Sequence, residues 1–208
     1  PRARGDSIVN RLFLRPQSRR TEGGALAIQR PLGGAFVGEV PESLARASAM
    51  ETWLDAPLDC QTLFEPWEFR SEEMTGTFSR MADVWTAGRI PLVTWELFTP
   101  TPEATPSDVL AQVATGEYDA SIAAWAEQLR SWLAGPDEIM WSSDDRRVYL
   151  RPLHEPNGDW YPWAPTASGC DPALYVSAWR RIHHIVHDAG VPRSCVRWTW
   201  AVNHVDVG

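Results

Sequence analysis

Residues 146–164 read RRVYLRPLHEPNGDWYPWA, which joins a strand-like run to a dense group of polar and aromatic residues. The run from Arg146 to Glu155 has the length and apolar content of a buried strand. At its end, His154 and Glu155 stand among aromatic side chains. A carboxyl group beside apolar rings is desolvated, which raises its pKa. The stretch therefore predicts a strand that ends in a general acid.

Strand-like runs and helical periodicity alternate on both sides of this stretch. This alternation predicts βαβ units and a parallel sheet, either doubly wound or a (β/α)8 barrel. No GxGxxG or GxxxxGK[ST] motif follows the first strand, which favours the barrel. The other expected strands are 33–38, 59–67, 90–98 and 196–203. The expected helices are 74–85, 122–133 and 172–190. Gly88 is expected to end the first helix, and Asp171 to be the N-cap of the third.

Composition narrows the class of ligand. The chain has 208 residues, 44% of them hydrophobic, and a net charge of −8. This favours one soluble domain and argues against a nucleic-acid partner or an anionic membrane. No run reaches the roughly 18 apolar residues of a membrane span. Residues 1–30 are expected to form a poorly ordered, arginine-rich lead-in without a visible signal peptide, and 31–208 to form the domain.

No metal or cofactor is expected. The three cysteines lack metal-ligand spacing, and the sequence does not decide whether Cys170 and Cys195 form a disulfide. His183 and His187 lie four residues apart on an expected helix, where a solvated outer face is the favoured interpretation over a metal pair.

Polar side chains recur where the expected strands end. Glu65, Glu96, Glu155 and Asn203 all hold this position, and in a barrel such ends open onto the face where active sites form. Arg151 is expected either to hold Glu96 or Glu65 or to be a buried structural residue. The 12 tryptophans predict an aromatic core, a sugar-stacking surface, or both, and for Trp95 the two interpretations are equally favoured.

RPLHEPNGDWYPW resembles the R-x-x-H-E-x-N-G-x-W-x-x-W signature of glycoside hydrolase family 26, best known for endo-β-1,4-mannanases. GAFVG, IPLVTWE and GEYDASIAAWAEQL follow the same order as in that family, so the resemblance covers about residues 33–205. It implies a (β/α)8 barrel and a retaining mechanism with Glu155 as general acid/base and His154 beside it. Pro156 departs from the methionine often found after the acid. The residues expected to bind substrate are Trp95, Glu96, Asn157, Trp160, Trp163 and Asn203.

One departure from the family concerns the nucleophile, which the resemblance places on a glutamate of strand seven. No glutamate follows Glu155, and only five strands can be counted. We therefore expect five of the eight barrel strands in this chain and a nucleophile outside it. The 208 residues alone are expected to be inactive and poorly soluble. The expected function is hydrolysis of β-1,4-mannan outside the cell. The alternatives are a β-1,3-1,4-glucan or β-1,3-xylan hydrolase, and a non-catalytic sugar-binding barrel.

Overall fold

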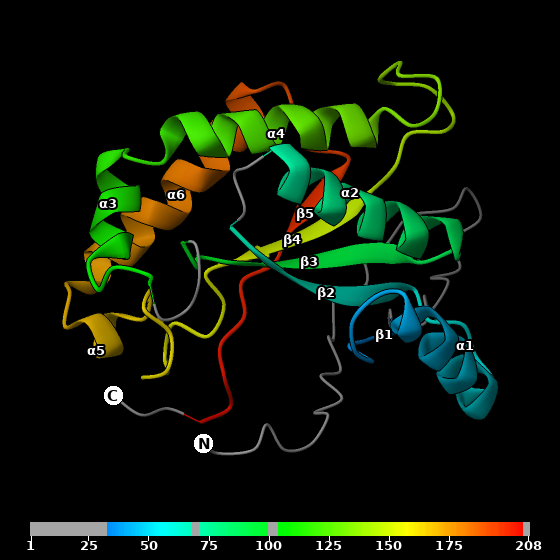
Figure 1. Cartoon of the computed structure of the whole chain (residues 1–208), viewed down its shortest axis with the longest axis horizontal. Helices are drawn as coiled ribbons and strands as arrows, with labels where there is room; N and C mark the ends of the chain where they lie inside the picture. Colours follow the sequence, from blue (N-terminus) through cyan, green and yellow to red (C-terminus); the bar gives the residue numbers. More distant parts are fainter. Residues whose placement is uncertain (1–32, 68–70, 100–103, 206–208) are drawn as a thin grey trace, which may run out of the picture.

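A parallel sheet of five strands forms the centre of the molecule (Figure 1). The computed structural model describes residues 33–67, 71–99 and 104–205, so the expected lead-in 1–30 lies outside the described residues. The strands follow one another across the sheet in chain order, each parallel to the next. They are β1 (Gly34–Ala35), β2 (Cys60–Pro66), β3 (Ile90–Glu96), β4 (Val148–Pro152) and β5 (Val196–Trp198).

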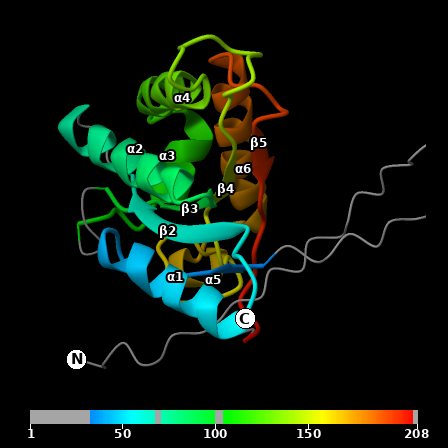
Figure 2. The same ribbon diagram turned by 90° about the vertical axis from the view of Figure 1, so that its right-hand side faces the viewer.

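The strand order and the helices decide between the two folds that the sequence allowed. A doubly wound sheet reverses its strand order and has helices on both faces. Here the order does not reverse, and α2, α4 and α6 gather on one side of the central strands (Figures 1 and 2). The structure thus confirms part of a (β/α)8 barrel, and the barrel is not closed by the described strands. The helices are α1 (Glu42–Leu54), α2 (Ser71–Thr86), α3 (Val109–Thr115), α4 (Asp119–Leu133), α5 (Pro165–Ser168) and α6 (Pro172–Asp188).

Alternate residues of each strand face the helices or the opposite side. In β3, Val93 and Trp95 belong to the core beneath the helices, whereas Thr94 between them accepts hydrogen bonds from Arg151 of β4. The core is rich in aromatic rings: Trp95 stacks on Trp125 of α4 with ring centroids 4.2 Å apart. Both tryptophans are buried in this structure and pack in its core.

Glu65 lies on the helix-covered side of β2. Its side chain is buried and accepts hydrogen bonds of 2.8 Å from Thr77 Oγ1 and from Arg80 Nε, both on α2. A buried carboxylate is tolerated when it is paired in this way. Glu65 therefore fastens α2 to the sheet and does not reach the opposite side, where Thr94 and Arg151 meet.

Several helix boundaries follow signals in the sequence, but α1, α3 and α5 were not predicted, and β1 and β5 are shorter than expected. Asp171 caps α6 by accepting a 2.8 Å hydrogen bond from Ala173 N, as predicted. Helix α1 was not predicted because its buried positions are the small residues Ser43 and Ala47, so no stripe of large apolar residues marks it. Strand β5 ends at Trp198 and not at residue 203, and the segment beyond it stays beside the chain after β4 through the bond from Glu155 N to Ala201 O.

Candidate functional site

The chain leaves β4 in an unusual backbone conformation. Leu153 has φ 49° and Glu155 has φ 53°, so both residues flanking His154 are left-handed. Non-glycine residues seldom adopt this conformation, and when they do the surroundings must hold them there. Such positions concentrate at active sites and binding sites.

One backbone group on each of three consecutive residues, 153–155, is fixed by a different part of the fold. We call these hydrogen bonds the β4 exit clamp. Because they come from α6, from the loop after β4 and from the segment after β5, the backbone that carries Glu155 is fixed from three directions. The bonds are Tyr175 Oη to Leu153 O at 2.9 Å, Trp163 Nε1 to His154 O at 2.8 Å, and Glu155 N to Ala201 O at 2.8 Å.

The carboxylate of Glu155 is partly exposed and receives a hydrogen bond from a tryptophan. Trp160 Nε1 donates to Glu155 Oε2 over 3.1 Å, while 44% of the Trp160 residue surface stays exposed. An indole donor fixes the direction of one carboxylate oxygen. Glu155 and Trp160, both predicted for the site, are therefore in direct contact.

Arg151 links this carboxylate electrostatically to the end of β3. Its buried guanidinium donates to Thr94 Oγ1 from Nε (2.9 Å) and Nη2 (2.5 Å) and lies over the ring of Phe64. Burial lowers the pKa of Arg151, and the negative charges of Glu155 and Glu96 act in the opposite direction. Arg151 is thus the buried structural residue that the sequence allowed. It does not pair with Glu65, which is bound to Arg80 on the other side of the sheet.

His154 is enclosed by aromatic rings and is uncharged at neutral pH. Only 2% of its surface is exposed, and its ring lies 4.5 Å from that of Tyr161 and 5.6 Å from that of Trp163, centroid to centroid. Burial and, to a smaller extent, the nearby Arg151 charge together lower the pKa of His154 to about 3. Within the described part of the chain, neither ring nitrogen has a hydrogen-bond partner.

The predicted aromatic ligands divide into exposed and buried rings. Trp160 is exposed, whereas Trp95 and Trp163 are fully buried, Trp163 stacked on Tyr161 at 4.4 Å. In this structure neither buried ring offers a face to a ligand, so for Trp95 burial favours the core interpretation.

Sequence reasoning missed Trp200. It follows β5 with 63% of its surface exposed, and its Nε1 donates over 3.2 Å to the Tyr175 hydroxyl of the exit clamp. The rule that strand ends carry site residues selected Asn203 because the expected strand was too long. Applied to the true end of β5, the same rule selects Trp200.

The two predicted asparagines bind each other. Asn157 Nδ2 donates to Asn203 O over 3.0 Å and to Val205 O over 3.1 Å, and Asn203 N donates to Asn157 Oδ1 over 2.8 Å. These bonds hold the segment after β5 against the loop after β4. The side-chain amide of Asn157 is thus already used in hydrogen bonds to the backbone of residues 203 and 205.

Two other candidates from the sequence, the histidines of α6 and the cysteines, form neither a metal site nor a disulfide among the described residues. His187 Nε2 accepts a 2.9 Å hydrogen bond from Trp198 Nε1, and its Nδ1 lies 2.8 Å from Val191 O, so both ring nitrogens are engaged. Cys170 and Cys195 are not bonded to each other. Among the residues described, no three His, Cys, Asp or Glu side chains are grouped to hold a metal ion, and no helix is long and apolar enough to cross a membrane.

An open part of an α/β barrel with a glutamate clamped at the carboxyl end of a strand is the arrangement found in barrel enzymes. No protein-family model matches the sequence. Endoglucanase H of Acetivibrio thermocellus is 30% identical over 177 residues, which make up 84% of this chain but 17% of that protein. The chain therefore spans a small part of its curated relative.

Solved structures show the same architecture. The family 26 β-mannanase BoMan26A of Bacteroides ovatus superposes with a TM-score of 0.50 at 16% identity, over 69% of this chain and 44% of that enzyme. A modular endo-β-1,4-mannanase of Cellulomonas fimi gives a TM-score of 0.47 at 20% identity over 62% of this chain and 29% of its own, too loose a match for inference. The chain thus has the fold of the corresponding part of a glycoside hydrolase family 26 enzyme, as the sequence resemblance predicted.

The burial of neutral His154 predicts a pH-dependent stability. Its pKa is about 3 in the folded chain and about 6.5 in an unfolded chain. Between these values the unfolded state binds more protons, so stability falls as pH falls from 6.5 toward 3. From pH 7 to pH 4.5 this group should cost on the order of 2 kcal/mol of unfolding free energy.

Urea unfolding of the chain and of His154→Phe at pH 7 and pH 4.5 measures this contribution. The variant should lose less stability on acidification than the unaltered chain, by roughly the amount above. His184→Phe, which removes an exposed histidine, should keep the full loss. Equal losses for all three proteins would show that His154 is not held neutral by burial.

Proposed function

We propose that this chain carries the acid/base part of a retaining glycoside hydrolase that acts on β-linked polysaccharide, with β-1,4-mannan as its first substrate. The observation that carries the proposal is the position of Glu155. It leaves the carboxyl end of β4 on a clamped, left-handed backbone, beside the exposed Trp160 and with Trp200 at the end of the next strand. Supporting evidence comes from the fold shared with a family 26 mannanase and the sequence shared with an endoglucanase.

In the first step, Glu155 protonates the glycosidic oxygen while a second carboxylate attacks the anomeric carbon. In the second step, Glu155 takes a proton from the water that hydrolyses the glycosyl intermediate. The indole N–H of Trp160 holds one carboxylate oxygen in a fixed direction, which leaves the other oxygen to face the glycosidic oxygen. His154, neutral and buried, adds no competing charge beside the acid.

The nucleophile must lie about 5–5.5 Å from Glu155 in a retaining enzyme. Glu65 does not meet this requirement, because it is buried under α2 on the other side of the sheet. No glutamate follows Glu155 in the sequence. Because the family resemblance places the nucleophile on strand seven, the proposal assigns it to a later barrel strand outside these 208 residues and not to Glu96, so that the 208 residues alone do not turn substrate over.

Mannan, mixed-linkage β-glucan and β-1,3-xylan share apolar ring faces, formed by axial C–H groups, that stack on tryptophan. The name of the endoglucanase relative makes glucan the strongest rival to mannan. Since such polymers are too large to enter a cell, the proposed place of action is outside it. A sugar-binding barrel without catalysis remains the alternative from another class.

The general-acid role of Glu155 predicts a dependence on the leaving group. In the protein that carries this chain, Glu155→Ala should lower kcat/KM on mannan by about 10²–10⁴-fold, because the leaving oxygen is no longer protonated. It should lower hydrolysis of dinitrophenyl β-mannosides, whose leaving group needs little protonation, much less. Asp159→Ala, which removes an exposed neighbouring carboxylate, is the control and should retain activity. Small, equal losses on both substrates for Glu155→Ala would remove the assignment.

The different burial of Trp160 and Trp163 predicts opposite effects of truncation. Trp160→Ala should weaken mannohexaose binding by about 1 kcal/mol in calorimetry with little change in Tm, because its ring is exposed. Trp163→Ala should lower the unfolding free energy by about 3–5 kcal/mol, because it leaves a cavity and removes one clamp bond. A large fall in Tm for Trp160→Ala with unchanged binding would contradict the sugar-stacking role.

A further inference from the structure

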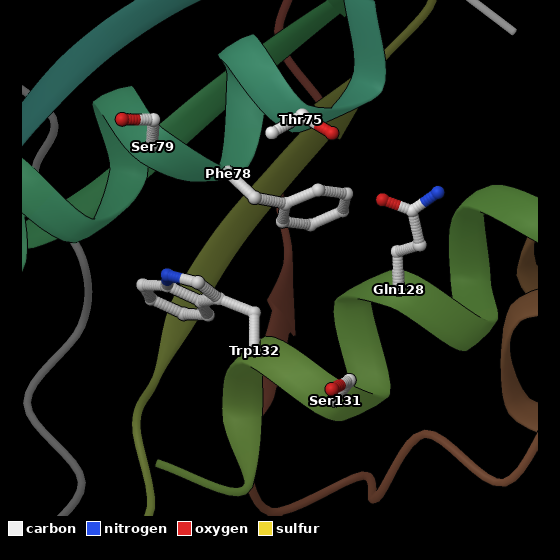
Figure 3. A pocket seen from close by; sticks show the side chains of 6 residues that line it. All are labelled: Thr75, Phe78, Ser79, Gln128, Ser131 and Trp132. Carbon is white, nitrogen blue, oxygen red and sulfur yellow. The ribbon is translucent and has the colours of Figure 1, made fainter. Parts of the chain in front are cut away.

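A groove of about 350 Å³ lies between α2 and α4 (Figure 3), and Glu155 is not among the residues that line it. Its volume is at the small end of ligand pockets, which suits a single ring better than a folded partner. Two of the lining side chains are aromatic and four carry a hydroxyl or an amide. They are Thr75, Phe78 and Ser79 of α2, and Gln128, Ser131 and Trp132 of α4.

The lining contains no charged side chain, although 22% of the chain is charged and both helices are partly exposed. A groove of this composition does not select an anion or a cation. It offers the small exposed parts of two largely buried rings together with neutral donors and acceptors. This is the composition that a neutral, hydroxyl-bearing ring requires.

Trp132 supplies a donor that the protein itself does not use. Only 7% of the residue is exposed, and within the described residues its buried Nε1 has no hydrogen-bond partner. The indole nitrogen lies on the edge of the ring that faces α2, across the groove (Figure 3). The guanidinium of Arg146, 5.2 Å from the ring centroid, helps to hold the indole in place. A buried N–H without an acceptor is unfavourable, so a ligand oxygen that reaches it would be bound favourably.

The other polar groups are close enough to contribute. Phe78 projects from α2 toward α4, with Trp132 and Gln128 on either side of it (Figure 3). The Gln128 amide points toward Thr75 and makes one weak contact, 3.7 Å from its nitrogen to Met74 Sδ. An amide held this loosely can turn to a ligand hydroxyl with little loss of existing bonding.

We infer that the groove between α2 and α4 is a second carbohydrate site, which takes one neutral hexose unit of the polysaccharide. The inference rests on the proposed function for the identity of its ligand. The site lies outside the catalytic end of the barrel, so it holds the polymer on the enzyme and takes no part in bond cleavage.

Proton NMR of the tryptophan indole N–H signals tests this site separately from the Glu155 site. In the protein that carries this chain, Trp132→Phe and Trp160→Phe assign the two signals of interest. Titration with β-1,4-mannohexaose, and with cellohexaose in parallel, should shift both signals with one of the two sugars. In Ser131→Arg, which places a charged side chain in the groove, the Trp132 signal should need at least tenfold more sugar to shift, while the Trp160 signal responds as before.

Ala49→Arg adds the same charge at an exposed position of α1 and should leave both titrations unchanged. A Trp160 shift without a Trp132 shift would overturn the second site and leave the proposed function standing. A Trp132 shift that Ser131→Arg does not weaken would also overturn it, because the sugar would then act from elsewhere. If neither signal responds to either sugar, both the second site and the polysaccharide assignment fail.

Discussion

The β4 exit clamp is the constraint on which the candidate site depends. Two left-handed residues in three positions are unfavourable for any chain, and this one is held by hydrogen bonds to Leu153 O, His154 O and Glu155 N. Each bond comes from a different element, so no single loop can relax without opposing the other two. The result is a glutamate whose backbone is fixed before any substrate arrives, which is what a proton donor needs.

The clamp also explains why so many aromatic residues surround one carboxylate. Trp163 and Tyr175 are buried and supply clamp donors, whereas Trp160 and Trp200 are exposed and remain tied to the same network through Glu155 and Tyr175. Buried rings exclude water around His154 and keep it neutral, and exposed rings offer faces to a ligand. Tryptophan suits both tasks because it joins a large apolar ring to a single N–H donor.

Much of the fold could be predicted because parallel strands that are buried on both faces appear in the sequence as short apolar runs. The apolar runs that became β2, β3 and β4, and the capping signals at Asp171 and Gly190, depend on local chemistry that sequence shows directly. Helix α1 could not be predicted, since it buries Ser43 and Ala47 and not large apolar residues. Its place is set by packing and by the hydrogen bond of 2.8 Å from Gln61 to Ser43, which is a tertiary contact.

In the candidate site, Glu155, His154 and Trp160 could be predicted from a motif in one short segment. The sequence could not predict which side of the sheet each strand-end carboxylate faces, because a shift of one residue in register moves a side chain to the opposite face. For that reason Glu65 looked equivalent to Glu96 in the sequence, and only the structure shows it bound to Thr77 and Arg80. Trp200 was missed because β5 ends at Trp198 and not at residue 203, and the segment after it is held by the tertiary bond from Glu155 N to Ala201 O.

The role of Glu155 is tested most directly by the anomeric configuration of the product that Glu155→Ala forms with azide. If Glu155 is the acid/base, its removal leaves space on the β-face of the glycosyl intermediate, and azide attacks there. The account therefore predicts a β-mannosyl azide, released from an activated aryl β-mannoside by the protein that carries this chain. An α-mannosyl azide would contradict it, because azide would then have replaced the nucleophile and Glu155 would hold that position instead.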